Sequence, residues 1–126
     1  MTLNFLPRKF WMAAGLALAI CFADGQVSAQ DSKQFSGTAA YYDKDYKGIV
    51  SSGETYDPNK FTAAHRTLPF GTRVLVTDLK TKRSVTVTVN DRGPFTERFV
   101  IDLSYAAAKK LDMIKRGVIK VTGVVQ

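Results

Sequence analysis

The chain has 126 residues, of which 45% are hydrophobic and 23% charged, and its formal net charge is +7 at pH 7. A chain of this length can form only one hydrophobic core, which excludes a large multidomain architecture. The positive charge is compatible with nucleic acid, anionic lipid or an acidic polymer as the partner, but Lys and Arg form no long run.

The N-terminus has the pattern of an export signal. Arg8 and Lys9 precede residues 10–22, an apolar run without charge that is too short to span a bilayer comfortably. Small residues at positions 27–29 fit a processing site. We therefore predict that residues 1–29 are a cleaved signal peptide and that the protein is exported, either to the periplasm or out of the cell.

Cys21, the only cysteine, lies where a lipoprotein signal would carry its lipidated residue. Lipoprotein processing needs a small residue before that cysteine, and Ile20 is not small, so cleavage after Ala29 is favoured over lipid anchoring. The mature chain would then contain no cysteine and no disulfide, and would keep six excess positive charges. Because an exported protein meets little nucleic acid, an acidic wall polymer is the favoured partner.

Short strands dominate the predicted elements. We expect a polar lead-in at 30–36 and a domain at 37–126, with strands at 35–42, 73–79, 84–90, 99–103 and 118–125, a long loop at 43–60, and a helix at 105–111. In the strand at 84–90, Val85, Val87 and Val89 alternate with polar residues. Five or six short strands with no second layer predict a small closed barrel, since closure removes exposed edges.

Three residues are candidates for chemistry. His65, the only histidine, precedes a Pro-Phe-Gly turn, and it could line a cleft or only cap the turn. Asp91 follows the alternating strand, where a carboxylate could be functional or could form an Asx-turn. Glu54 lies in the long loop, where a solvated glutamate is the default expectation.

The motifs AAHRTLPFGT (residues 63–72) and VNDRGPF (residues 89–95), with IDLS at 101–104 and three alanines at 106–108, resemble the rare lipoprotein A family of bacterial cell-wall proteins. The resemblance covers residues 37–125. It implies a mainly β fold, a small six-stranded double-psi β-barrel with one short helix. Members of this family include lytic transglycosylases, which cut peptidoglycan glycan strands, prefer strands stripped of peptides, and leave an anhydro-muramic acid end.

The family's essential residues match Glu54, His65 and Asp91. In a lytic transglycosylase the muramic acid's own hydroxyl attacks the anomeric carbon, so one carboxyl group can act first as acid and then as base. We expect Asp91 to be this acid/base, with Glu54 and His65 orienting it, binding sugar hydroxyls or stabilising the developing cation. The roles can be exchanged, and a hydrolytic outcome would require a second carboxylate, Glu54 or Asp102.

Substrate binding is expected from cationic and aromatic side chains in or next to the same loops. Arg66 and Arg92 could pair with the lactyl carboxylate of muramic acid. Sugar faces could stack on Tyr41, Tyr42, Tyr56, Phe70 and Phe95. We expect no metal and no cofactor, a monomer, and peptidoglycan glycan strands as the partner, with cell-division or cell-wall proteins as further partners.

A rival hypothesis is an expansin-like module that binds or loosens wall glycan without cutting it. The chain ends at Gln126, whereas larger members of the family carry a C-terminal domain for denuded glycan, so weak or lost activity is compatible with the sequence. Ser51 and Ser52 also replace the Ala-Asn that commonly precedes the Gly-Glu pair.

Overall fold

The computed structural model describes residues 33–126. The predicted signal peptide, the cleavage after Ala29 and the alternative lipid anchor at Cys21 fall outside these residues. Within the described part of the chain, no helix is both long and apolar enough to cross a membrane.

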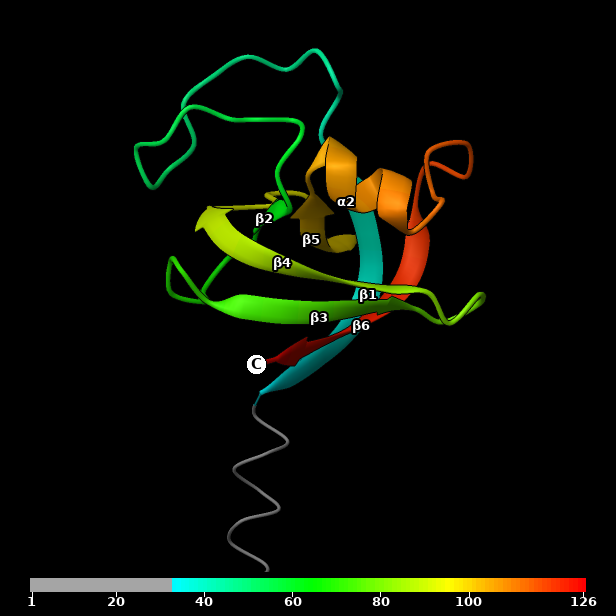
Figure 1. Ribbon diagram of the computed structural model, residues 1–126. Helices are drawn as coiled ribbons and strands as arrows, with labels where there is room; N and C mark the ends of the chain where they lie inside the picture. Colours follow the sequence, from blue (N-terminus) through cyan, green and yellow to red (C-terminus); the bar gives the residue numbers. More distant parts are fainter. Residues whose placement is uncertain (1–32) are drawn as a thin grey trace, which may run out of the picture. The chain divides into compact units, whose positions relative to one another are not determined.

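Six strands and one short helix make up the described domain (Figure 1). They are β1 (Gln34–Tyr41), β2 (Thr62–Ala64), β3 (Arg73–Asp78), β4 (Ser84–Asp91), β5 (Phe99–Leu103), α2 (Tyr105–Lys110) and β6 (Ile119–Val125). The strands close into a barrel in the order β1-β5-β2-β4-β3-β6. The predicted small barrel with one helix is therefore confirmed.

Several element ends differ from the sequence prediction by one residue, and one strand was not predicted. β1 begins at Gln34, inside the expected lead-in, because Gln34 and Phe35 already pair with β6. β2 was not expected as a strand, since three residues are too few to show an alternating pattern. This short strand is nevertheless central, because it pairs in parallel with β4 and antiparallel with β5.

The core fills the barrel with small and medium apolar side chains. Val85, Val87 and Val89 are buried, as their alternation predicts. Ile101 and Leu103 of β5 are fully buried beside them. Alternate residues of each strand therefore face inward, and the residues between them form an outer face that is available for function.

The helix α2 begins as predicted at Ser104. The Ser104 side chain accepts a hydrogen bond from the Ala107 N–H at 3.3 Å, which satisfies one of the free donors of the first turn. It also accepts from the Thr62 N–H at 3.2 Å. Ser104 thus ties the start of the helix to β2 at the edge of the outer face.

Candidate functional site

A β-bulge determines where Asp91 lies. Ala63 of β2 pairs with Val89 of β4, but the next residue, Ala64, pairs with Asp91, so Asn90 is an extra residue on β4. A bulge reverses the alternation beyond it. Asp91 therefore leaves the inward register of the valines and shares the outer face with Ala64.

Asp102 of β5 occupies the same row on the other side of β2. Ala64 pairs with Asp91 on one neighbour and with Asp102 on the other. Ile101 and Leu103 point into the barrel, so Asp102 points outward. Two carboxylates therefore flank a small alanine on the outer face of three adjacent strands.

Four hydrogen bonds hold the Asp91 carboxylate. Oδ1 accepts from the Ser51 N–H and hydroxyl, both at 2.8 Å, and from the Arg92 N–H at 2.9 Å. Oδ2 accepts from the Tyr42 hydroxyl. Burial alone would raise the pKa of Asp91, but the hydrogen bonds from Tyr42, Ser51 and Arg92 outweigh it and lower that pKa. Asp91 is thus held as an anion.

Asp102 has the opposite electrostatic situation. Burial and the negative charge of Asp91 raise the pKa of Asp102, and the nearby positive charge of Arg66 offsets only part of this. The two carboxyl groups therefore differ in protonation tendency although they lie in one row. Divergent pKa values in a pair of carboxyl groups are typical of acid-base sites.

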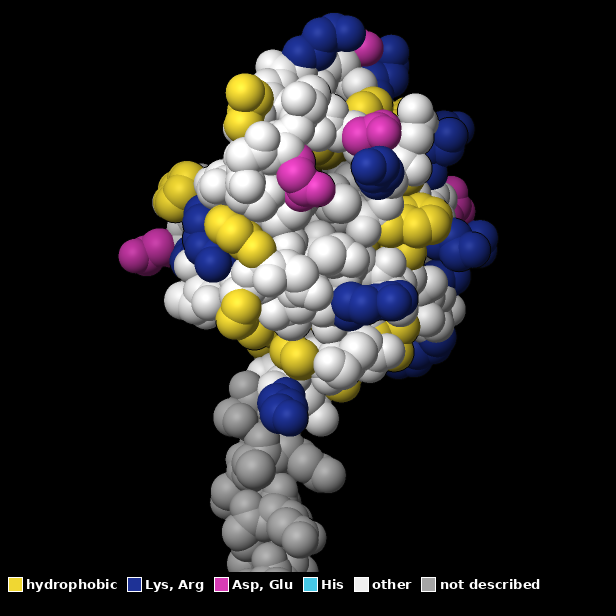
Figure 2. Space-filling view, turned by 60° about the vertical axis from the view of Figure 1, so that its left-hand side comes forward, with side chains coloured by type: hydrophobic (Ala, Val, Ile, Leu, Met, Phe, Trp, Pro, Cys, Tyr) yellow, Lys and Arg dark blue, Asp and Glu magenta, His cyan; other side chains and the backbone are white. Residues whose placement is uncertain are grey.

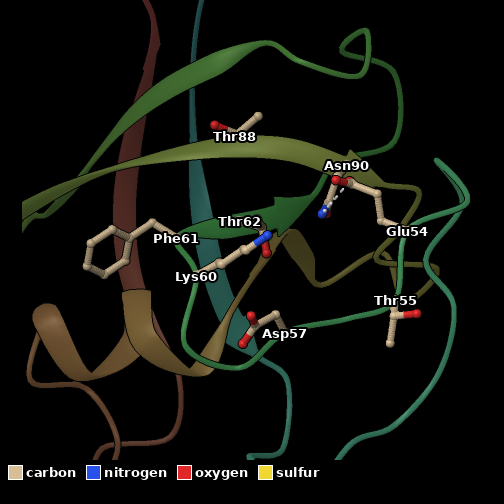
Figure 3. Close-up of a pocket in the computed structure, with 8 residues that line it drawn as sticks. All are labelled: Glu54, Thr55, Asp57, Lys60, Phe61, Thr62, Thr88 and Asn90. Carbon is tan, nitrogen blue, oxygen red and sulfur yellow. Dashed lines mark hydrogen bonds between the residues drawn. The ribbon is translucent and has the colours of Figure 1, made fainter.

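Glu54 lies at the edge of a groove of about 260 Å³ that opens over the same outer face. Its Oε1 accepts from Asn90 Nδ2 at 3.1 Å (Figure 3). The same oxygen accepts from the Ser52 hydroxyl at 2.9 Å. The groove is lined by Glu54, Thr55, Asp57, Lys60, Phe61, Thr62, Thr88 and Asn90. Thr62 and Thr88 pair two positions before Ala64, so the groove lies on the same outer face as the two aspartates, which do not line it.

In the described part of the molecule, no hydrogen bond joins the His65 ring to the Asp91 carboxylate. Its Nδ1 accepts from the Thr67 and Leu68 N–H groups at 3.1 and 3.2 Å, and the ring packs on Phe35 with 4.9 Å between centroids. Burial and the charges of Arg66 and Arg92 lower the pKa of His65. His65 contacts Asp91 through its backbone, with its N–H 3.1 Å from the Asp91 carbonyl oxygen.

Both candidate arginines hold loop backbone. Arg66 donates to the carbonyls of Thr96 and Phe99 at 2.9 and 2.7 Å. Arg92 donates to the carbonyls of His65 and Leu68 at 3.1 and 2.7 Å.

The Arg92 guanidinium also stacks 4.1 Å above the centroid of the Phe70 ring. These contacts fix the loops that follow β2 and β4.

The candidate aromatic residues differ in what they contact: some bond to backbone, one bonds to Asp91, and one is exposed. Tyr41 donates to the Ile114 carbonyl at 2.9 Å, and Tyr56 is buried, with its hydroxyl accepting from the Tyr105 N–H at 3.0 Å. Tyr42 stacks on Tyr56 at 4.7 Å and reaches Asp91, so its hydroxyl serves the carboxylate. Phe95 is 86% exposed and is free to contact a ligand.

Sequence reasoning assigned no site role to Ser51, Asn90 or Phe61, and it gave Asp102 only a conditional one. Phe61 is 46% exposed and lines the groove next to Thr62. Only the motif IDLS, which was recognised as part of the resemblance, was a signal for Asp102. Among residues 33–126 no group of three or more His, Cys, Asp or Glu residues could hold a metal ion.

Basic side chains are distributed over the surface of the described domain. On the face shown in Figure 2, Lys and Arg side chains lie mostly apart from one another around the margin, with hydrophobic and acidic side chains between them. No single continuous basic patch covers this face, which does not resemble the stripe of Lys and Arg typical of nucleic-acid binding.

The closed order of six strands with mixed pairing, and the carboxylates and groove on one outer face, define a double-psi β-barrel with a candidate glycan site. A sequence model of the family described as "Lytic transglycolase" matches residues 34–123, and the chain belongs to that family. The resemblance found from the motifs is thereby confirmed.

Curated relatives of this chain are named as endolytic peptidoglycan transglycosylases. The endolytic peptidoglycan transglycosylase RlpA of Haemophilus influenzae is 45% identical over 94 residues, covering 72% of this chain and 33% of that protein. A probable enzyme of the same name from Nostoc is 52% identical over 87 residues, covering 67% of this chain and 24% of that protein. The chain thus spans about a third or less of the length of these relatives.

Solved structures share the fold. The Streptomyces papain inhibitor has a TM-score of 0.60 and 29% identity, covering 73% of this chain and 93% of that chain. A Clavibacter michiganensis expansin solved in complex with cellohexaose has a TM-score of 0.59 and 21% identity, covering 74% of this chain and 50% of that chain. The expansin likeness concerns the fold alone.

Proposed function

We propose that this protein is a peptidoglycan lytic transglycosylase that cleaves glycan strands and leaves an anhydro-muramic acid end. One observation carries the proposal: Asp91, whose pKa is lowered, and Asp102, whose pKa is raised, flank Ala64 on the outer face over which the Glu54 groove opens. The names of the relatives, which describe endolytic peptidoglycan transglycosylases, support the same reaction.

Bond cleavage needs a proton on the leaving oxygen and stabilisation of positive charge at the anomeric carbon. Asp91 suits the second task, because its hydrogen bonds favour the anionic form. Among the described residues, no Lys or Arg side chain forms an ion pair with it. This favours a role for Asp91 in which it stabilises the cation instead of supplying the proton.

The two other predicted site residues have supporting roles in this proposal. Glu54 lies at the groove, where its second oxygen can accept a sugar hydroxyl while Oε1 is held by Ser52 and Asn90. His65 fixes the end of β4 through its backbone bond to Asp91. Phe61 and Phe95 offer exposed ring faces for sugars.

The substrate implies where the protein acts. Peptidoglycan lies outside the cytoplasmic membrane, so the proposal requires export to the periplasm or the cell surface. The positive charge of the chain suits an acidic wall polymer. We keep the predicted signal peptide at residues 1–29, a monomeric state and cell-wall protein partners as parts of this proposal.

The test is to incubate residues 30–126 with murein stripped of peptides and to weigh the released fragments. We expect fragments with an anhydro end, and we expect Asp91→Asn to lower their release at least about 100-fold. The matched control is Asp112→Asn, which removes an exposed carboxylate at a left-handed position that Asn tolerates.

Other outcomes would contradict the proposal in different ways. Fragments with reducing ends would indicate hydrolysis instead of transglycosylation. Binding without any fragment would favour the expansin-like module that loosens or binds glycan. Undiminished release by Asp91→Asn would remove Asp91 from the reaction.

A further inference from the structure

We propose that Asp102, and not Asp91, donates the proton to the leaving glycosidic oxygen, while Asp91 stays ionised beside it. This inference rests on the proposed function and assigns its central proton to one residue. Its basis is the outer-face row Asp91-Ala64-Asp102, which the bulge at Asn90 creates.

The spacing within this row suits two carboxyl groups that act on one sugar. Neighbouring strands lie about 4.8 Å apart, so the backbones at Asp91 and Asp102 are about 10 Å apart across β2. Ala64 contributes only a methyl group between them. Ala64 itself is 1% exposed, so the sugar does not rest on it, but Asp91 and Asp102 are both partly exposed and can border the same sugar ring.

Each element packed against Asp102 contributes to its charge environment. Asp91 on β4 supplies the negative charge that disfavours ionisation of Asp102. Arg66, which follows β2, supplies an opposing positive charge, but its guanidinium is committed to the carbonyls of Thr96 and Phe99. Tyr42, which follows β1, is uncharged at neutral pH and donates its hydroxyl proton to Asp91.

The two carboxyl groups therefore have separate tasks. The pKa of Asp91 is lowered and that of Asp102 is raised, so at any given pH Asp102 carries a proton more often than Asp91 does. A proton donor must hold its proton until the bond breaks. Asp102 suits this requirement better than Asp91, because the hydrogen bonds to Asp91 favour the form that has lost its proton.

The reaction balances with these two residues. The bond between the anomeric carbon and the leaving oxygen breaks, and the leaving oxygen takes the proton of Asp102. The anionic Asp91 stabilises the positive charge on the anomeric carbon. The 6-hydroxyl oxygen of muramic acid then bonds to that carbon and passes its proton to the Asp102 carboxylate, which restores the starting state without water.

One group can serve both proton transfers because both occur on the same face of the sugar. The leaving oxygen departs from the face of the ring that carries the 6-hydroxyl group, and the anhydro bond forms on that face. Asp102 would lie on this side and Asp91 on the other.

The first test compares Asp102→Asn with Asp112→Asn in the murein assay. We expect Asp102→Asn to lower fragment release at least about 100-fold without weakening sedimentation of the protein with murein, and Asp112→Asn to match wild type. We expect Asp102→Glu, which keeps an acid, to recover part of the activity. Release by Asp102→Asn above a tenth of the wild-type rate would overturn the inference and leave the proposed function standing.

A second test needs no active variant. Carbon-13 NMR titration of the carboxyl groups should give wild-type Asp102 a pKa above the ordinary aspartate value, and that pKa should fall in Asp91→Asn. The rate of fragment release by wild type should fall as the pH rises through the pKa measured for Asp102. An ordinary or lowered pKa at Asp102 would overturn the inference, while an inactive wild type would overturn the proposed function and the inference together.

Discussion

Two well-bonded aspartates lie in different regions of the barrel, and their partners differ in charge. Asp78, at the end of β3, is 1% exposed and accepts from Lys80 N–H at 2.9 Å, from Thr81 at 3.0 Å and from the Arg116 guanidinium. Asp91, at the end of β4, also accepts several hydrogen bonds, but all of them come from uncharged donors.

The difference separates a structural carboxylate from one that we propose to take part in the reaction. Burial opposes ionisation of Asp78, but the hydrogen bonds from Arg116, Lys80 and Thr81 and the Arg116 charge lower its pKa, and the pair is electrically neutral. Asp91 is stabilised as an anion without being neutralised. Its charge therefore acts on its surroundings, as the raised pKa of Asp102 indicates.

Breaking the neutral pair should have the largest effect on stability. Arg116→Ala leaves the buried Asp78 without its countercharge, and we expect the free energy of unfolding to fall by about 3 kcal/mol. Urea unfolding at neutral pH measures this. Arg83→Ala, at an exposed arginine that forms no ion pair in the described domain, should change stability by less than about 0.5 kcal/mol. Equal losses in the two variants would mean that Asp78 does not depend on its cation.

A smaller effect is expected from removing one uncharged donor at Asp91. Tyr42→Phe deletes the hydroxyl that donates to Oδ2, so the pKa of Asp91 should rise toward its ordinary value and stability should fall by about 1.5 kcal/mol. Carboxyl NMR and urea unfolding give the two readouts. Tyr46→Phe, in the same aromatic cluster, is the matched control and should leave both unchanged. An unmoved Asp91 pKa in Tyr42→Phe would show that the hydroxyl does not hold the anion.

Much of the fold could be predicted from the sequence because its signals are local. The alternation of Val85, Val87 and Val89 predicts the buried face of β4, and Ser104 predicts the start of α2. β2 could not be predicted, since three residues carry no period and the strand exists only through its pairing with β4 and β5.

The residues of the candidate site could be named from the motifs, but their arrangement could not. The motifs single out Asp91, yet the alternation would place it on the buried face, and only the pairing of Ala64 reveals the bulge. Tyr42 was expected to stack on sugar, but its hydroxyl donates a hydrogen bond to the Asp91 carboxylate. Contacts between residues 49 positions apart leave no local pattern in one sequence.

The smallest expected effect is in the pH dependence of stability, where the aspartates act with opposite signs. Asp78 and Asp91 have lowered pKa values in the folded state, so their stabilisation is present above about pH 4 and is lost as the pH falls below it. Asp102 has a raised pKa, so the folded state retains its proton longer and stability falls as the pH rises through that pKa.

Asp102→Asn isolates this second contribution. His65, whose pKa is lowered, makes stability rise with pH near its unfolded value, and wild type and variant share that term. The difference in urea midpoint between them should therefore favour Asp102→Asn increasingly as the pH rises above about 4, the ordinary aspartate pKa. Parallel midpoints over this range would mean that Asp102 ionises as an ordinary aspartate and that the anion at Asp91 is screened from it.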